Sequence, residues 1–74
     1  MERLPVDVVY RIREFSRQLE TLGARSLVNY VLYEFEVGGP SLEVLDEAER
    51  LALKSIEELK QVVDLLKELK RLVA

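Results

Sequence analysis

The sequence contains no cysteine, no histidine and no tryptophan, and it has only three glycines and two prolines in 74 residues. Without cysteine the chain has no disulfide, and without cysteine and histidine it lacks the ligands of the usual zinc sites. The commonest general base and the thiolate nucleophile are missing as well. These absences predict a protein that is not an enzyme, with no catalytic residues, no metal site and no cofactor.

Long uncharged runs are also absent. The longest segment without a charged side chain is 26–33, whereas a membrane-spanning helix needs about 18 apolar residues. Charged residues near the N-terminus, such as Asp7 and Arg11, interrupt the apolar segment that a signal peptide requires. We therefore expect a cytoplasmic protein that does not enter a membrane. Acidic and basic residues are mixed along the chain and give a net charge of −3, so no basic tail indicates a nucleic-acid partner.

What the chain does have is a large hydrophobic fraction for its size. Residues 1–74 are enough for one small domain, and a chain this short buries only about 60% of its unfolded surface. Yet 49% of its residues are hydrophobic, which predicts that part of the apolar surface meets another chain. The content of charged residues is 34%, beside one Asn, two Gln and one Met, a composition typical of thermostable proteins.

The C-terminal segment has the clearest helical pattern. Ser41 follows Pro40 and is a favourable N-cap, and no Gly or Pro interrupts the following residues. Steps of three and four generate a coiled-coil-like seam. The seam consists of Leu45, Ala48, Ala52, Ser55, Leu59, Val62, Leu66, Leu69 and Val73. Because further apolar residues flank the seam on both sides, this helix of about 42–73 is expected to contact at least two neighbours.

The N-terminal segment predicts a helix over about 5–22. Pro5 suits a first helical turn, and Gly23 suits the position just after a helix. Apolar residues recur at steps of four and three between them, at Val8, Ile12, Phe15, Leu19 and Leu22. The apolar face then inverts at Gly23, which favours a break or kink at 23–26, with Ser26 capping the next helix, over one continuous helix of 5–37.

Residues 28–37 fit two secondary structures. Val31, Tyr33, Phe35 and Val37 alternate with other residues as in a strand. A helical stripe runs through the same segment, and it comprises Ala24, Leu27, Val28, Val31, Leu32 and Phe35. No second strand exists in the chain, so a strand here would need an intermolecular partner. We therefore favour a helix over 26–37.

Two further functions remain as alternatives. Residues 15–34 can be placed on a helix-turn-helix with Gly23 in the turn, which would make the protein a small nucleic-acid-binding regulator. The residues that would contact nucleic acid are Arg11, Arg13, Arg17, Arg25 and Asn29. The third class is a helical enzyme that uses Arg and Glu to hold an anion.

The favoured prediction is an all-α protein, an antiparallel helical hairpin or a three-helix arrangement, that associates into a helical bundle. Its expected function is that of a non-enzymatic assembly or adaptor protein acting through protein–protein contacts. We expect a homo-oligomer, with a dimer favoured, or a complex with a helical protein partner. The candidate interface residues are Leu27, Tyr30, Val31, Tyr33, Phe35, Leu53, Ile56 and Val63.

Overall fold

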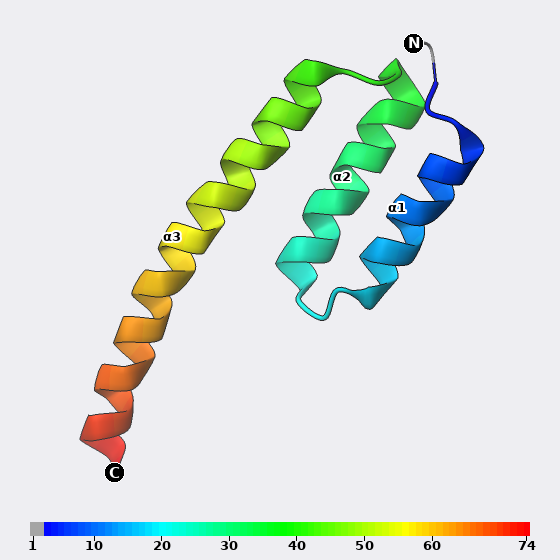
Figure 1. Ribbon diagram of the computed structural model, residues 1–74. Helices are drawn as coiled ribbons and strands as arrows, with labels where there is room; N and C mark the ends of the chain where they lie inside the picture. Colours follow the sequence, from blue (N-terminus) through cyan, green and yellow to red (C-terminus); the bar gives the residue numbers. More distant parts are fainter. Residues whose placement is uncertain (1–2) are drawn as a thin grey trace.

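The computed structural model describes residues 3–74, and these residues form three α-helices and no strand (Figure 1). The helices are α1 (Val6–Gln18), α2 (Leu22–Gly38) and α3 (Leu42–Val73). The predicted all-α fold with a three-helix arrangement is thereby confirmed. The ambiguous segment 28–37 lies inside α2, so helical periodicity outweighs the β-favouring residues there.

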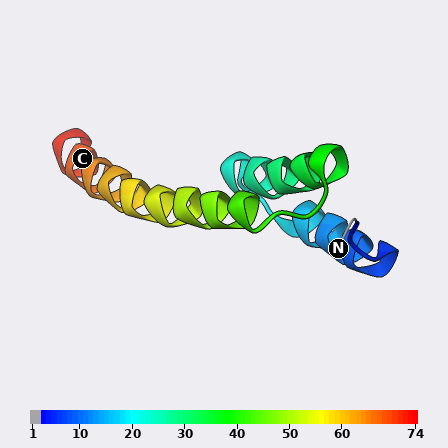
Figure 2. The ribbon, with the colours of Figure 1, turned by 90° about the horizontal axis from the view of Figure 1, so that it is seen from above.

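The helices lie side by side with α2 in the middle (Figure 1). Both α1 and α3 run antiparallel to α2 and pack on it, and within residues 3–74 they do not contact each other. Because a helix rises about 1.5 Å per residue, the 32 residues of α3 are about 48 Å long and the 17 residues of α2 only about 26 Å. The far part of α3 therefore extends beyond the hairpin that α1 and α2 form, as the view from above also shows (Figure 2).

The connection between α2 and α3 uses the residues that the sequence indicates. Gly39 has a φ of 81°, a left-handed conformation that glycine adopts without steric cost, and its N–H donates to the Phe35 carbonyl at 2.9 Å. The Ser41 hydroxyl then accepts from the Val44 N–H at 3.4 Å, so the predicted N-cap is confirmed. This short turn makes α3 fold back along α2.

The break between the first two helices lies earlier than the sequence predicts. The helices expected at about 5–22 and 26–37 are instead Val6–Gln18 and Leu22–Gly38, so the predicted break at 23–26 is wrong. Leu19 and Thr21 have extended backbones, and Thr21, a favoured N-cap residue type, precedes α2 in place of Ser26. Gly23 lies in the first turn of α2, where a glycine is tolerated at a cost of about 1 kcal/mol.

The hydrophobic core is small and centres on α2. Leu32 is the buried residue of α2, and the predicted stripe on this helix faces inward, since its other members are half-buried. Against α2 lie the half-buried Val8, Ile12 and Leu19, whereas Phe15 and Leu22 are exposed. The predicted N-terminal stripe is therefore only partly used, because Leu22 belongs to the next helix.

The molecule exposes more surface than its mass requires. Its accessible surface is 6571 Å², against about 4,700 Å² for a compact monomer of 8.6 kDa. The radius of gyration is 16.4 Å, with extents of 55 × 23 × 14 Å, whereas a compact domain of this length has a radius near 11 Å. Most of this excess comes from the extension of α3 past the hairpin.

Candidate interaction surface

The first half of α3 contributes to the core. On the seam Ala48 is buried and Ala52 half-buried, and Val44 beside the seam is half-buried too, because α2 packs against this half of α3. Leu45, the first seam residue, remains 44% exposed. Small alanine side chains let the two helices approach closely. We call residues 42–52 the covered half of α3.

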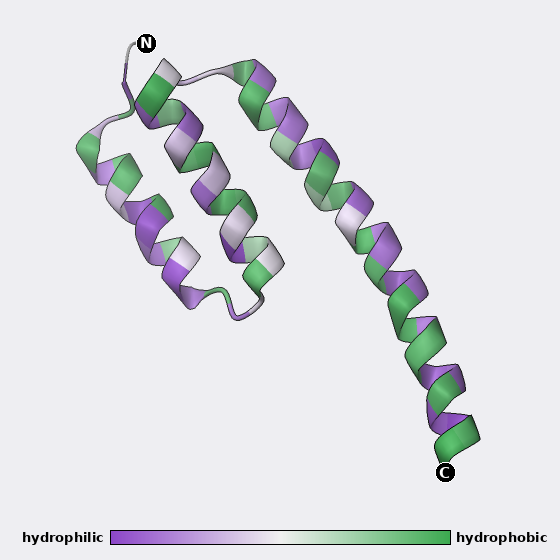
Figure 3. Ribbon diagram, turned by 180° about the vertical axis from the view of Figure 1, so that it is seen from behind, coloured by the Kyte–Doolittle hydropathy of each residue, from purple (hydrophilic) through white to green (hydrophobic). Residues whose placement is uncertain are grey.

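From Ser55 onward the same seam has no neighbour among residues 3–74. We call residues 55–73 the uncovered half of α3. Leu59 is 61% exposed and Leu66 is 51% exposed, although they continue the face on which Ala48 is only 8% exposed. Ala48 and Leu66 are about five turns apart and point in the same direction. Figure 3 shows hydrophobic residues recurring along α3 to its end.

The edges of the seam are apolar too. Ile56 and Val63 flank it on one side and Leu65 and Leu72 on the other, and all four are exposed. Nine large apolar side chains therefore lie on the uncovered half, and they are Ile56, Leu59, Val62, Val63, Leu65, Leu66, Leu69, Leu72 and Val73. A patch of this kind marks a contact surface in a soluble protein.

The predicted interface residues do not form one patch. Three of them are half-buried within the chain, namely Leu27, Val31 and Phe35. The two tyrosines are exposed, Tyr33 at 63% and Tyr30 at 37%. The two tyrosines lie on the face of α2 that points away from Leu32 and the inward stripe. They form a smaller outer patch with Val37, which is also exposed.

On α3 the other three predicted residues divide as well. Ile56 and Val63 border the seam, but Leu53 is 60% exposed and lies about 140° around the helix from Ala48. The sequence-based list omitted Leu59, Leu66 and Leu69, although their spacing had identified them as seam residues. What the spacing could not supply was how far along α3 the N-terminal end of α2 reaches.

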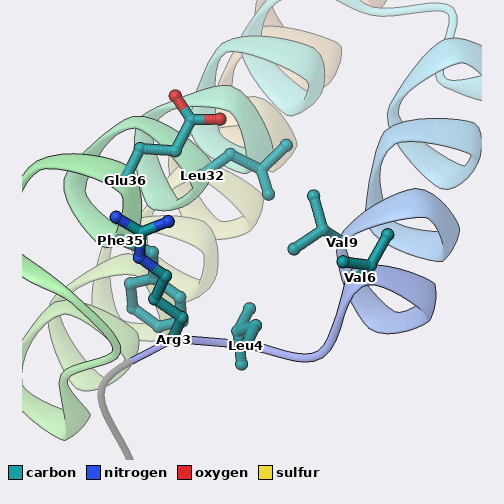
Figure 4. A pocket seen from close by; sticks show the side chains of 7 residues that line it. All are labelled: Arg3, Leu4, Val6, Val9, Leu32, Phe35 and Glu36. Carbon is teal, nitrogen blue, oxygen red and sulfur yellow. The ribbon is translucent and has the colours of Figure 1, made fainter.

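A shallow hollow opens between the start of α1 and the end of α2 (Figure 4). It encloses about 360 Å³, and its walls are Val6, Val9, Leu32 and Phe35, with Leu4 below and Arg3 and Glu36 at the rim. A second depression of about 350 Å³ shares Arg3, Phe35 and Glu36 and extends to Gly38–Pro40. No pattern in the sequence predicts this hollow, because its walls come from residues that are far apart along the chain.

The acidic group at the hollow, Glu36, is already paired. Arg13 Nη2 donates to Glu36 Oε1 at 2.6 Å across the two helices. Both side chains are more than half exposed, and such a surface pair contributes about 0–1 kcal/mol. With one carboxylate that already accepts from Arg13, the hollow has an apolar character and no concentration of one charge.

The residues proposed to contact nucleic acid are spread over two antiparallel helices. Arg17 pairs with Glu14 at 2.6 Å, Arg11 and Arg25 are exposed, and Asn29 Oδ1 accepts from the buried Ser16 hydroxyl at 3.0 Å. Gly23 lies within α2 and not in the turn, so the turn assigned to the helix-turn-helix at 15–34 is wrong. Helices of that motif meet at about 90–120°, whereas α1 and α2 run antiparallel.

The ion pair between Glu47 and Arg50 shifts the pKa of both residues. The Arg50 guanidinium donates to both carboxylate oxygens of Glu47, at 3.1 and 2.6 Å. This hydrogen bonding, with the positive charge of Arg50, lowers the pKa of Glu47 and raises that of Arg50. The pair lies on the covered half of α3, one turn apart.

No group of three or more His, Cys, Asp or Glu side chains is arranged to hold a metal ion within residues 3–74. None of the three helices described is long and apolar enough to cross a membrane.

Comparisons with known proteins give no match: no protein-family model, no curated protein and no solved structure resembles this chain.

Proposed function

We propose that this protein is a non-enzymatic assembly or adaptor protein that acts by helix-to-helix contacts, first of all with itself. The observation that carries the proposal is the uncovered half of α3, where Leu59, Leu66 and Leu69 are exposed on the face that α2 buries at Ala48. Helices gain most of their stability in proteins from packing an apolar face. A seam that continues for five turns past α2, the helix that covers its first part, is suited to a second helix.

The size of the exposed surface supports the same conclusion. The chain exposes about 1,900 Å² more than a compact monomer of its mass. A standard protein–protein interface buries about 800 Å² on each partner, and obligate homodimers bury more. One standard interface therefore fits within the surplus.

Charge pairing favours assembly over nucleic-acid binding. Arg13 and Arg17 are engaged with Glu36 and Glu14, so two of the four arginines in the alternative site have their charge balanced locally. Binding to phosphates would require unpaired cations on one face.

We also propose, on its composition, that the protein is cytoplasmic and resists heat. Its low content of Asn, Gln and Met beside 34% charged residues supports thermostability. Thermal unfolding is expected well above the range of about 45–65 °C that is usual for mesophile domains. A midpoint inside that range would refute the thermostability.

The solution mass tests the proposal directly. Light scattering or sedimentation of the purified chain at about 50 μM is expected to give twice the chain mass of 8.6 kDa, and the melting temperature is expected to rise with protein concentration. A folded monomer at this concentration, with a melting temperature independent of concentration, would refute self-association.

A further inference from the structure

We propose that the uncovered half of α3 pairs antiparallel with the uncovered half of a second copy, about a two-fold axis level with Asp64. This inference rests on the proposed self-association and specifies its geometry. The occupant is a second copy because the uncovered half matches itself in length and in side-chain size, and because a standard interface of about 800 Å² on each partner fits within the surplus surface of the chain.

The direction of pairing follows from where α2 lies. α2 packs on the seam face of α3 at Val44, Ala48 and Ala52. In a parallel pair, the second copy's α3 would run along this face from the same end, and it would need the space that α2 fills. In an antiparallel pair centred on the uncovered half, each hairpin lies beyond the C-terminal end of the other copy's α3. Only this direction lets residues 55–73 meet their counterparts over their whole length.

The register follows from the seam itself. An axis at Asp64 places Leu59 opposite Leu69 of the second copy, and Val62 opposite Leu66. The smallest seam residue of this half, Ser55, comes opposite Val73. Antiparallel coiled coils alternate the two seam positions across the interface in this way, and each layer except the terminal one with Ser55 then contains apolar side chains of compatible size.

The seam edges support this register as well. Around the axis, Val63 lies beside Val63 of the second copy on one edge, and Leu65 beside its counterpart on the other. These exposed side chains widen the contact beyond a narrow two-residue seam.

The acidic residue at the axis does not oppose this register. Asp64 is level with itself, but it lies on the outer side of the helix, about 160° from the seam. Glu57 and Arg71 are one heptad before and after Asp64 on the same outer side, so neither of them faces the second copy.

A cross-linking experiment on the full chain tests both direction and register. The natural sequence has no cysteine, so Leu59→Cys and Leu69→Cys each introduce a single reactive thiol. Each variant is treated on its own with a short bismaleimide cross-linker. A mixture of the two variants, unfolded and refolded together, is treated in the same way. Residues 59 and 69 are about 15 Å apart along a helix, and the reagent is chosen to span less than this.

The proposal expects a covalent dimer only in the mixture of the two variants. Peptide mapping is then expected to find residue 59 joined to residue 69. A matched mixture of Leu59→Cys with Leu53→Cys, whose thiol lies off the seam, is expected to give no covalent dimer. Cross-linking of either seam variant with itself would show a parallel pair and overturn the proposal.

The solution mass of each variant separates this test from the test of the proposed function. If the variants are dimeric but the seam mixture does not cross-link, the antiparallel register is wrong and self-association stands. If they and the natural chain are monomeric, both proposals are wrong.

Discussion

The covered and uncovered halves of α3 have the same helical pattern of apolar residues but differ in how far this pattern is buried within the single chain. Ala48 and Leu66 lie on one face, yet the first is buried and the second is 51% exposed. The difference comes from α2, whose 17 residues accompany only part of the 32 residues of α3. The side chains differ accordingly: the covered half has alanines where α2 approaches closely, and the uncovered half has leucines and valines. A seam with large side chains and no neighbour among residues 3–74 is the feature on which the proposed self-association rests.

The largest effect is expected from a charge on the uncovered seam. Leu66→Asp places a carboxylate in the centre of the proposed contact, twice per dimer. Burying it there would cost at least about 3 kcal/mol, more than a hundredfold in the dissociation constant. Sedimentation at several concentrations measures the change.

The matched control for this variant is Leu53→Asp. Leu53 is on α3 and similarly exposed in the single chain, but it lies away from the seam. It is expected to leave the dimer intact. Equal loss of association in the two variants would contradict the assignment of the seam as the interface.

A second substitution probes the covered half. Ala48→Leu adds three carbons where α2 and α3 meet, and overpacking of this kind costs about 1–3 kcal/mol of unfolding free energy. Chemical denaturation followed by circular dichroism measures the loss. Glu57→Leu, at an exposed position on the solvent side, is the control and should change stability by about 0.5 kcal/mol or less. No loss for Ala48→Leu would mean that α2 does not cover this half closely.

A smaller and opposite effect is expected at Gly23. A Cβ added there meets no atom within 4 Å, and the residue is helical. Gly23→Ala should therefore stabilise the protein by about 0.4–1 kcal/mol, because alanine has less backbone freedom to lose on folding. Denaturation midpoints measure the gain. Destabilisation would show that residue 23 belongs to a turn, and that α2 begins later than Leu22.

The smallest effect concerns the Glu47–Arg50 pair on the covered half. The pKa of Glu47 is lowered by the hydrogen bond from Arg50 and by its charge. A lowered pKa stabilises the fold above the unfolded value, and this contribution is lost as the pH falls through the folded value. NMR titration is expected to show a raised Glu47 pKa in Arg50→Gln. An unchanged pKa would mean that the pair does not form in solution.

The sequence predicted much of this fold because its signals are local. The Ser41 cap and the unbroken run after it located α3 correctly, and the absence of any second strand was sufficient to assign 28–37 to a helix. The break between α1 and α2 was misplaced because Gly23 looked like a helix end. A glycine in a first helical turn costs only about 1 kcal/mol, and α2 begins directly after the extended Thr21, whose side chain makes no capping hydrogen bond.

The interface was harder to predict than the helices. Periodicity identifies which residues share a face of α3, but it does not show how far α2 extends along that face. The three half-buried residues Leu27, Val31 and Phe35 were assigned to an interface, because a wheel of α2 alone cannot distinguish packing within the chain from packing between chains. The hollow beside Arg3 and Glu36 depends on how the ends of α1 and α2 meet, and no spacing in the sequence encodes that.

Hydrogen exchange along α3 tests the central claim most directly, since it compares the two halves in one molecule. At about 100 μM, amides of residues 59–69 are expected to be protected as well as those of residues 44–52, and dilution towards the dissociation constant should remove protection from 59–69 first. If residues 59–69 exchange rapidly at every concentration while 44–52 remain protected, the uncovered half of α3 has no partner in solution.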